Sequence, residues 1–140
     1  MTRLLRNLLL ATLIFACTLS LLSCGKGIQM DEAKAMLNDF LATIEAEDYE
    51  AAQALLHPDR PADLEDFLLG VEQEQGLDFQ TGIEIERYTH FSSALYDSTV
   101  GGSRYELTAR TKVGESTMFF TVEIVKNDNG YGIYNFNLST

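Results

Sequence analysis

The side chains best suited to acid–base chemistry in this chain are two histidines and several tyrosines. His57 and His90 lie far apart in the sequence and lack the paired spacing of a metal site. His57 precedes a proline at the end of a predicted helix, where a surface or capping role is expected. His90 ends a predicted strand near Tyr88 and is therefore the stronger candidate for a general base. The alternative for His90 is an exposed or hydrogen-bonded residue at a strand end.

Three cations, Arg104, Arg110 and Lys112, occupy one face of one predicted strand in an otherwise acidic sequence. They form a candidate surface for an acidic partner or ligand. The alternative is a solvated outer face on which the cations pair across strands with acidic residues, namely Glu84, Glu86 or Glu123.

We predict neither a metal nor a cofactor. The run from Asn127 to Gly130 carries oxygen ligands, but it lacks the twelve-residue calcium loop and its closing glutamate, and a hairpin turn explains it fully. No serine stands in a nucleophile-elbow pattern, and no glycine-rich loop precedes a helix to hold phosphate.

The charge of the chain disfavours two kinds of binding, to nucleic acid and to anionic lipid. Its formal net charge is −11, and all 21 acidic residues follow Cys24, whereas Arg3 and Arg6 precede it. Because an acidic domain repels the phosphate backbone, nucleic-acid binding is disfavoured. Electrostatic binding of basic residues to anionic lipid is disfavoured for the same reason. Any membrane attachment therefore has to be covalent or through the leader.

The first 23 residues have the profile of a signal peptide. Arg3 and Arg6 precede an apolar run from Leu8 to Leu22, which is shorter than the roughly 20 residues that a membrane-spanning helix needs. An anchor that stays in the membrane is the less favoured alternative.

The end of this leader, Leu21-Leu22-Ser23-Cys24, resembles the bacterial lipobox. The resemblance implies that Cys24 receives a diacylglycerol, that the leader is cut before it and that the new N-terminus can be acylated as well. Two or more chains give stable anchoring. Residues 24–29 then comprise the lipidated cysteine and a short linker, whose flexible segment is Gly25, Lys26 and Gly27. A few residues span only about 10 to 15 Å, which holds the domain near the lipid headgroups.

Residues 30–140 are predicted to begin with three helices. The first extends from about Met30 to Glu47 with Asp31 as its N-cap, and its apolar residues share one face: Ala33, Leu37, Phe40, Leu41 and Ile44. Asp48 caps a brief second helix, which His57-Pro58 stops.

The third helix follows Pro61, which suits a first helical turn, and continues to Gly76. From Thr81 the apolar residues alternate with polar ones, which predicts an antiparallel meander of about four to five strands. Glycine-containing turns separate these strands. Helices followed by a sheet give the α+β class.

The run from Ala33 to Pro58, with Phe40-Leu41, Asp48-Tyr49 and Leu55-Leu56, followed by meandering strands, resembles the nuclear transport factor two-like superfamily. The resemblance implies a curved sheet that wraps the helices into a cystatin-like cone with a cavity at its open end. Many relatives carry a tryptophan in the last strand, and this chain has none. Phe119, Phe120 and Tyr134 are the residues that would fill the cavity.

Enzymes of that superfamily, such as ketosteroid isomerases and scytalone dehydratases, use an Asp or His base and Tyr donors inside the cone. The resemblance therefore implies that Tyr88, His90 and Tyr105 are candidate cavity residues, with Asp97 as a further acid. For Tyr88 and Tyr105 the alternative is a core aromatic whose hydroxyl bonds the backbone.

These observations favour an exported lipoprotein, anchored to the cell membrane or outer membrane through Cys24, with its domain outside the cytoplasm. Its domain is expected to be non-enzymatic and to bind an envelope protein or a small apolar ligand. The alternatives are a small isomerase or dehydratase and an accessory interaction module without a ligand.

Overall fold

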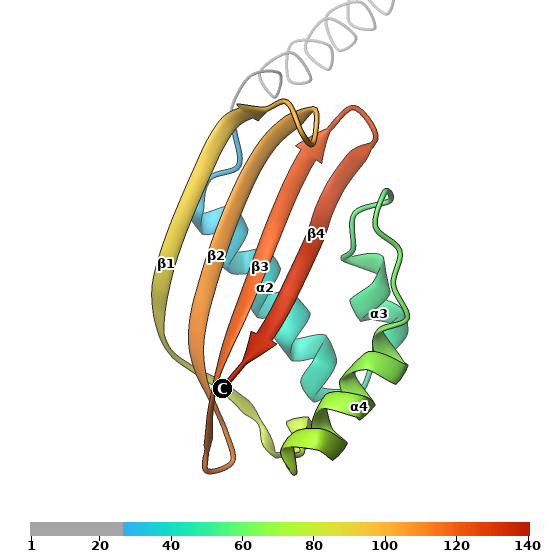
Figure 1. Cartoon of the computed structure of the whole chain (residues 1–140), viewed down its shortest axis with the longest axis vertical. Helices are drawn as coiled ribbons and strands as arrows, with labels where there is room; N and C mark the ends of the chain where they lie inside the picture. The colour runs from blue at the N-terminus through green and yellow to red at the C-terminus, as the bar shows by residue number, and fades with distance from the viewer. Residues whose placement is uncertain (1–26) are drawn as a thin grey trace, which may run out of the picture.

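The structure, a computed structural model, describes residues 27–140, so the predicted signal peptide and Cys24 lie outside the described residues. Within this range three α-helices and a short 3₁₀ helix precede four strands (Figure 1). The helices are α2 (Met30–Glu45), α3 (Tyr49–Ala54), α4 (Leu64–Gln75) and the short 3₁₀ helix η1 (Phe79–Thr81). The strands are β1 (Ile83–Asp97), β2 (Gly102–Val113), β3 (Ser116–Asn127) and β4 (Gly130–Ser139). The predicted α+β class is confirmed.

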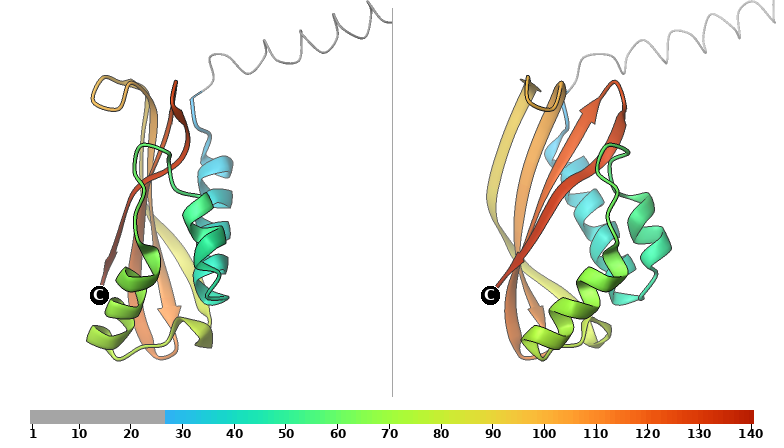
Figure 2. Two further views of the ribbon diagram at one scale, coloured as in Figure 1. Left: turned by 90° about the vertical axis from the view of Figure 1, so that its right-hand side faces the viewer. Right: turned by 45° about the vertical axis from the view of Figure 1, so that its right-hand side comes forward.

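The four strands form one antiparallel sheet in the order β1-β2-β3-β4, which is the predicted meander. From Ser103 to Val113 the odd-numbered residues of β2 are buried and the even-numbered ones are half-buried or exposed. Successive side chains of a strand point to opposite faces, so the odd positions define an inner face and the even positions an outer face. Figure 2 shows α2 along one face of the curved sheet and α4 beside one end of β4.

The core lies between α2 and the inner face of the sheet. The predicted apolar stripe of α2 is buried, from Ala33 to Ile44. Phe136 of β4 packs edge-on against Phe40 of α2 at 5.4 Å and against Phe67 of α4 at 5.2 Å between ring centroids. Burial of one such large apolar side chain stabilises the fold by about 1.5–3 kcal/mol. The aromatic contacts therefore join both helices to the last strand.

The start of α2 differs from the predicted one. Gln29, and not Asp31, occupies the N-cap position. The carboxylate of Glu32 accepts a hydrogen bond of 2.8 Å from the backbone N–H of Gln29, as in a capping box. Because Glu32 supplies this bond from the third helical position, Asp31 is already inside the helix. The helix ends at Glu45, close to the predicted Glu47.

The third helix starts later than Pro61. It begins at Leu64, because the side chain of Asp63 accepts a hydrogen bond from the backbone N–H of Asp66 at 3.3 Å. An Asp side chain satisfies a free N–H at a helix start, which a proline cannot do. Gly76 ends the helix in the left-handed conformation, with φ of 64°, as predicted. No helix within residues 27–140 is long and apolar enough to cross a membrane.

Candidate functional site

His90 does not end the first strand, contrary to the prediction. Strand β1 continues to Asp97, and His90 pairs with Thr108 on the outer face of the sheet. Its Nε2 lies 3.2 Å from Oε1 of Glu106, and 55% of its side chain is exposed. Directly paired residues place their side chains on the same face, so His90 points away from the helices and the core.

Tyr88 and Tyr105 lie on the inner face. Tyr88 pairs with Ala109, and its hydroxyl donates a 3.4 Å hydrogen bond to Oδ1 of Asn38 on α2. Tyr105 is only 5% exposed and belongs to the core. Burial raises the pKa of Tyr105, and the nearby Asp31 carboxylate raises this pKa further. A phenol with a raised pKa stays protonated at neutral pH, so Tyr105 is suited to donate a hydrogen bond and not to act as a base.

The three residues expected at a cavity are therefore not brought together. The sheet separates His90 from Tyr88 and Tyr105. Phe120 is 1% exposed and packs edge-on against Phe79 on the inner side, with 6.1 Å between the centroids. Phe119 pairs with Arg110 on the outer face. Of these two phenylalanines, Phe120 therefore belongs to the apolar interior and Phe119 does not.

Each of the three predicted partner-surface cations faces an acid on the outer face. Arg104 lies 3.5 Å from the carboxylate of Asp97, and Arg110 lies 3.2 Å from that of Glu86. Lys112 stands opposite Glu84 in the β1–β2 register. The pKa of Asp97 is lowered, first by hydrogen bonds from Thr99 and then by Arg104. This arrangement fits the alternative of a solvated face whose charges pair across strands.

His57 has a structural position that the sequence did not indicate. It is 1% exposed, so of the expected surface or capping role the surface part is wrong. Its Nε2 is 3.0 Å from Oδ1 of Asn127, and its Nδ1 accepts a 3.1 Å hydrogen bond from the backbone N–H of Asp59. The backbone N–H of His57 donates to the carbonyl of Ile133 at 2.8 Å. His57 thus fastens the loop between α3 and α4 to the β3–β4 hairpin.

Asn127 is the centre of this polar cluster. Its Oδ1 also accepts hydrogen bonds from the backbone N–H groups of Asn129 and Gly130, at 2.9 and 3.1 Å. Its Nδ2 donates to the carbonyl of Val100 at 2.9 Å, which ties in the β1–β2 turn. The predicted hairpin turn is confirmed. Within residues 27–140 no group of three His, Cys, Asp or Glu side chains is arranged to hold a metal.

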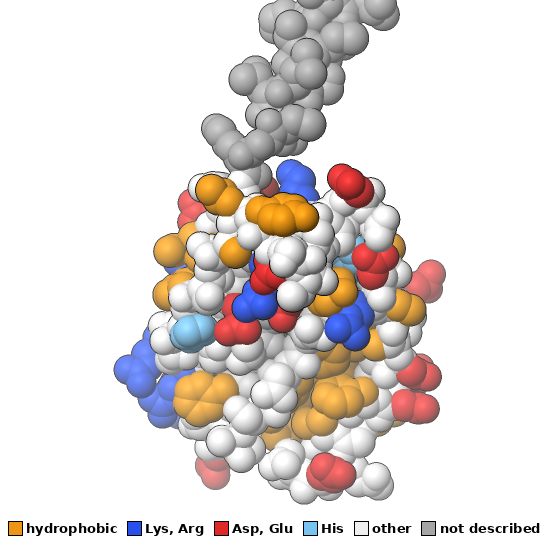
Figure 3. Space-filling view, turned by 45° about the horizontal axis from the view of Figure 1, so that its top comes forward, with side chains coloured by type: hydrophobic (Ala, Val, Ile, Leu, Met, Phe, Trp, Pro, Cys, Tyr) orange, Lys and Arg blue, Asp and Glu red, His pale blue; other side chains and the backbone are white. Residues whose placement is uncertain are grey.

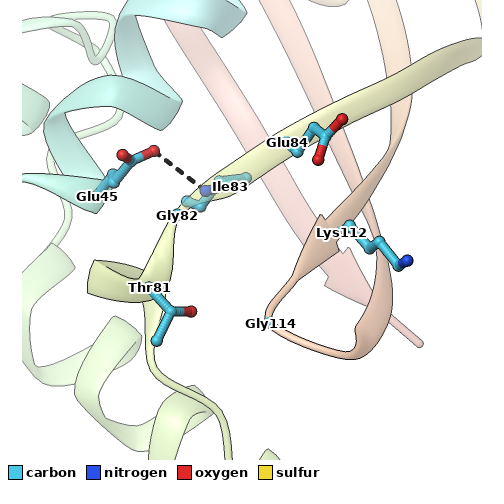
Figure 4. Close-up of a pocket in the computed structure, with 7 residues that line it drawn as sticks. All are labelled: Glu45, Thr81, Gly82, Ile83, Glu84, Lys112 and Gly114. Atoms are coloured by element: carbon cyan, nitrogen blue, oxygen red, sulfur yellow. Dashed lines mark hydrogen bonds between the residues drawn. The ribbon is translucent and has the colours of Figure 1, made fainter.

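Two of the hollows on the surface of residues 27–140 lie beside the sheet. One lies between the end of α2 and the β2–β3 turn, where the Glu45 carboxylate accepts a 3.1 Å hydrogen bond from the Ile83 N–H and Lys112 points away (Figure 4). The other is a groove between the α3–α4 loop and β4. Its accessible lining is polar and apolar in about equal parts, and it is formed by Leu56, Arg60, Pro61, Ala62, Ile133, Tyr134, Asn135 and Phe136. The Arg60 guanidinium lies 4.6 Å from the ring centroid of Tyr134.

Exposed apolar side chains gather at the end of the sheet where the described chain begins. Asp97, Gly102, Asn127 and Gly130 meet in register at this end. We call the exposed group here the anchor-end patch; it consists of Met30, Leu95, Tyr96 and Tyr131, which are 44%, 79%, 70% and 41% exposed. Figure 3 shows hydrophobic side chains at this end of the domain, with charged side chains beside them.

Comparison with protein-family models, with curated proteins and with solved structures finds no match to this chain.

Proposed function

We propose that this protein is a lipid-anchored component of the cell envelope whose folded domain is a non-enzymatic binding module of the nuclear transport factor two-like kind. The observation that carries the non-enzymatic part is the position of His90. The one histidine suited by sequence to act as a base lies on the outer face, whereas Tyr88 and Tyr105 lie on the inner face. General acid–base catalysis needs its groups within hydrogen-bond reach of one substrate.

The order of elements supports the family. Three helices followed by a curved antiparallel sheet of four strands are what the resemblance implies for a cone. The groove beside β4 supports binding, because it is a concave surface that combines apolar side chains with polar groups, as ligand and partner sites do. Pro61, Tyr134 and Phe136 provide apolar surface there, and Arg60 adds one cation above the Tyr134 ring. The ligand class that fits is a small apolar molecule or an apolar side chain of an envelope protein.

The lipobox-like sequence supports the anchor. Gly27, where the described domain begins, follows Cys24 by three residues. Three residues span at most about 11 Å, so a lipid on Cys24 would hold the domain at the membrane surface. A thioether-linked diacylglycerol, with an acylated N-terminus, supplies enough buried methylene groups for stable attachment.

Substitution of the two cysteines tests the anchor. Cys24→Ala should release the folded domain from the membrane fraction and abolish incorporation of labelled palmitate. Cys17→Ala is the matched control, since Cys17 lies inside the predicted leader, and it should leave labelling and membrane retention unchanged. Unchanged retention and processing of the Cys24→Ala protein would count against the proposal. Retention is measured by fractionation and labelling by autoradiography.

A further inference from the structure

We propose that the anchor-end patch rests on the lipid bilayer, so that the domain docks with the β1–β2 and β3–β4 hairpins toward the membrane. This inference depends on the proposed anchor at Cys24. The docking gives the domain a fixed orientation and a second, non-covalent contact with lipid. An anchor on a short linker alone requires neither of these.

The exposure of the patch is the first argument. Leu95 and Tyr96 are 79% and 70% exposed, the highest values among the exposed large apolar side chains of residues 27–140. They lie in the irregular stretch of β1 between Ala94 and Asp97, where the regular pairing with β2 is interrupted. Contiguous exposed apolar side chains mark interaction sites. A hairpin tip with no partner has no packing reason to carry them.

The position of the patch is the second argument, and it identifies the lipid bilayer as the surface that the patch contacts. A Cβ placed on Gly27 would lie 2.8 Å from Cδ2 of Leu95, so Leu95 is in contact with the first described residue. Cys24 is three residues earlier and therefore within about 11 Å. A lipid chain attached to Cys24 would enter the bilayer beside Leu95. The nearest large apolar phase is then the membrane itself.

The chemistry of the patch suits the bilayer interface. Leu95 and Met30 can enter the boundary between headgroups and acyl chains, a region about 5–10 Å deep for interfacial segments. Tyr96 and Tyr131 have an apolar ring and a polar hydroxyl, and tyrosine is enriched at the headgroup level. Tyr131 is partly exposed and partly buried; its partial burial raises the pKa of its hydroxyl, and the Glu32 carboxylate raises this pKa further, so the hydroxyl remains neutral. The acidic domain favours zwitterionic over anionic lipid.

The opposite end of the sheet differs in composition. There the β2–β3 turn presents Gly114, Glu115 and Ser116, all exposed. In an antiparallel meander this turn is a strand length away from the anchor-end patch, as Figure 1 shows. A residue of this turn therefore provides a probe that the same anchored protein should keep away from the membrane.

A single tryptophan introduced at each end tests the orientation, because the chain contains no tryptophan. The lipidated protein with Tyr96→Trp, and separately with Glu115→Trp, is reconstituted into vesicles of phosphatidylcholine and phosphatidylethanolamine. Some of the lipid carries bromine or a spin label at a defined depth. Incorporation of palmitate at Cys24 is measured on the same preparations.

We expect the fluorescence of Tyr96→Trp to shift to shorter wavelength and to be quenched by shallow labels. The Glu115→Trp signal should stay at the wavelength of an exposed indole and remain unquenched. Equal quenching of both probes, or of neither, in protein that carries the palmitate label would overturn the docking while leaving the anchor intact. Absence of the palmitate label would overturn the anchor and the docking together.

Discussion

The two ends of the sheet are built in different ways. At the end that follows Cys24, His57 and Asn127 connect two hairpin turns and the α3–α4 loop through side-chain hydrogen bonds. At the other end, the β2–β3 turn projects with exposed residues at Gly114 and Glu115. The end that carries the exposed apolar patch is thus also the end in which loops distant in sequence are fixed to one another.

This difference bears on function. A surface that meets a membrane or a partner keeps its shape only if the loops beneath it are fixed, because fixed loops lose less entropy on contact. The cluster around Asn127 provides that support at the end of the sheet that carries Leu95 and Tyr96. The following substitutions weaken the cluster to different degrees, from the largest expected effect on stability to the smallest.

Gly132→Ala should have the largest effect. A Cβ at Gly132 would lie 2.7 Å from the backbone N of His57 and 2.8 Å from the carbonyl oxygen of Leu55. Backbone atoms cannot give way cheaply, so the hydrogen bonds of Ile133 to both residues would be strained or lost. We expect a loss of about 3 kcal/mol in the free energy of unfolding, measured by urea denaturation.

Gly70→Ala is the matched control for that substitution. A Cβ at Gly70, in the middle of α4, meets nothing within 4 Å. Alanine favours a helix over glycine by up to about 1 kcal/mol, so this variant should be more stable than the parent. A similar loss in both variants would show that the close contact at Gly132 does not hold the loop.

Asn127→Ala should have the next largest effect. It removes the acceptor of the His57 ring and of the Asn129 and Gly130 N–H groups, and it leaves a nearly fully buried imidazole without that partner. The loss of these hydrogen bonds and the unsatisfied donors should lower the free energy of unfolding by about 2 kcal/mol. The measurement is again urea denaturation.

Asn135→Ala is the control, because Asn135 is exposed and its side chain makes one 3.3 Å hydrogen bond, to Glu123. It should change stability by less than about 0.5 kcal/mol. Equal losses of stability in the Asn127 and Asn135 variants would contradict the view that the polar cluster around Asn127 stabilises the end of the sheet that carries the anchor-end patch.

Asp59→Asn should have the smallest effect, and one that depends on pH. Hydrogen bonds from Asn129, then from Asn127, and the neighbouring His57 lower the pKa of Asp59. A carboxyl group with a lowered pKa in the folded state adds stability above its ordinary pKa of about 3.9. That contribution is lost as the pH falls through the lowered pKa.

The parent should therefore exceed Asp59→Asn in stability at pH 7, and the difference should shrink progressively below about pH 4. Thermal unfolding of both proteins, followed by circular dichroism at several pH values, measures this difference in stability. Asp128→Asn, in the β3–β4 turn beside the Asn129 that Asp59 contacts, serves as the control for a change of charge alone. A difference between parent and Asp59→Asn that grows toward acid pH would contradict the assigned direction of the pKa shift.

Periodicity in the sequence predicted the elements of the fold well. The stripe on α2 and the alternation along β2 each depend on one element and its burial, which local spacing records. The predicted N-cap of α2 and the predicted start of α4 were wrong. Each helix start is fixed by one hydrogen bond between residues three apart, made by Glu32 in α2 and by Asp63 before α4, and the sequence offers several residues that could make such a bond. Helix ends depend on such single bonds more than on periodicity.

The candidate site was less predictable. The burial of His57 depends on Asn127, which lies 70 residues later in the chain, so no local pattern announces it. His90 lies within β1, and not at its end, because this strand is longer than predicted. Its side chain lies on the outer face because the pairing with β2 is irregular between Tyr88 and His90. A one-residue shift in a strand moves a side chain to the other face. The exposure of Leu95 and Tyr96 likewise follows from an irregularity that the sequence does not mark.

The most direct test of the central claim is the mass of the N-terminal peptide from protein isolated from membranes. The proposed function predicts a peptide that begins at Cys24 and carries a diacylglycerol on its sulfur, with residues 1–23 absent. A peptide in which an unmodified Cys24 is still joined to Ser23 would contradict it.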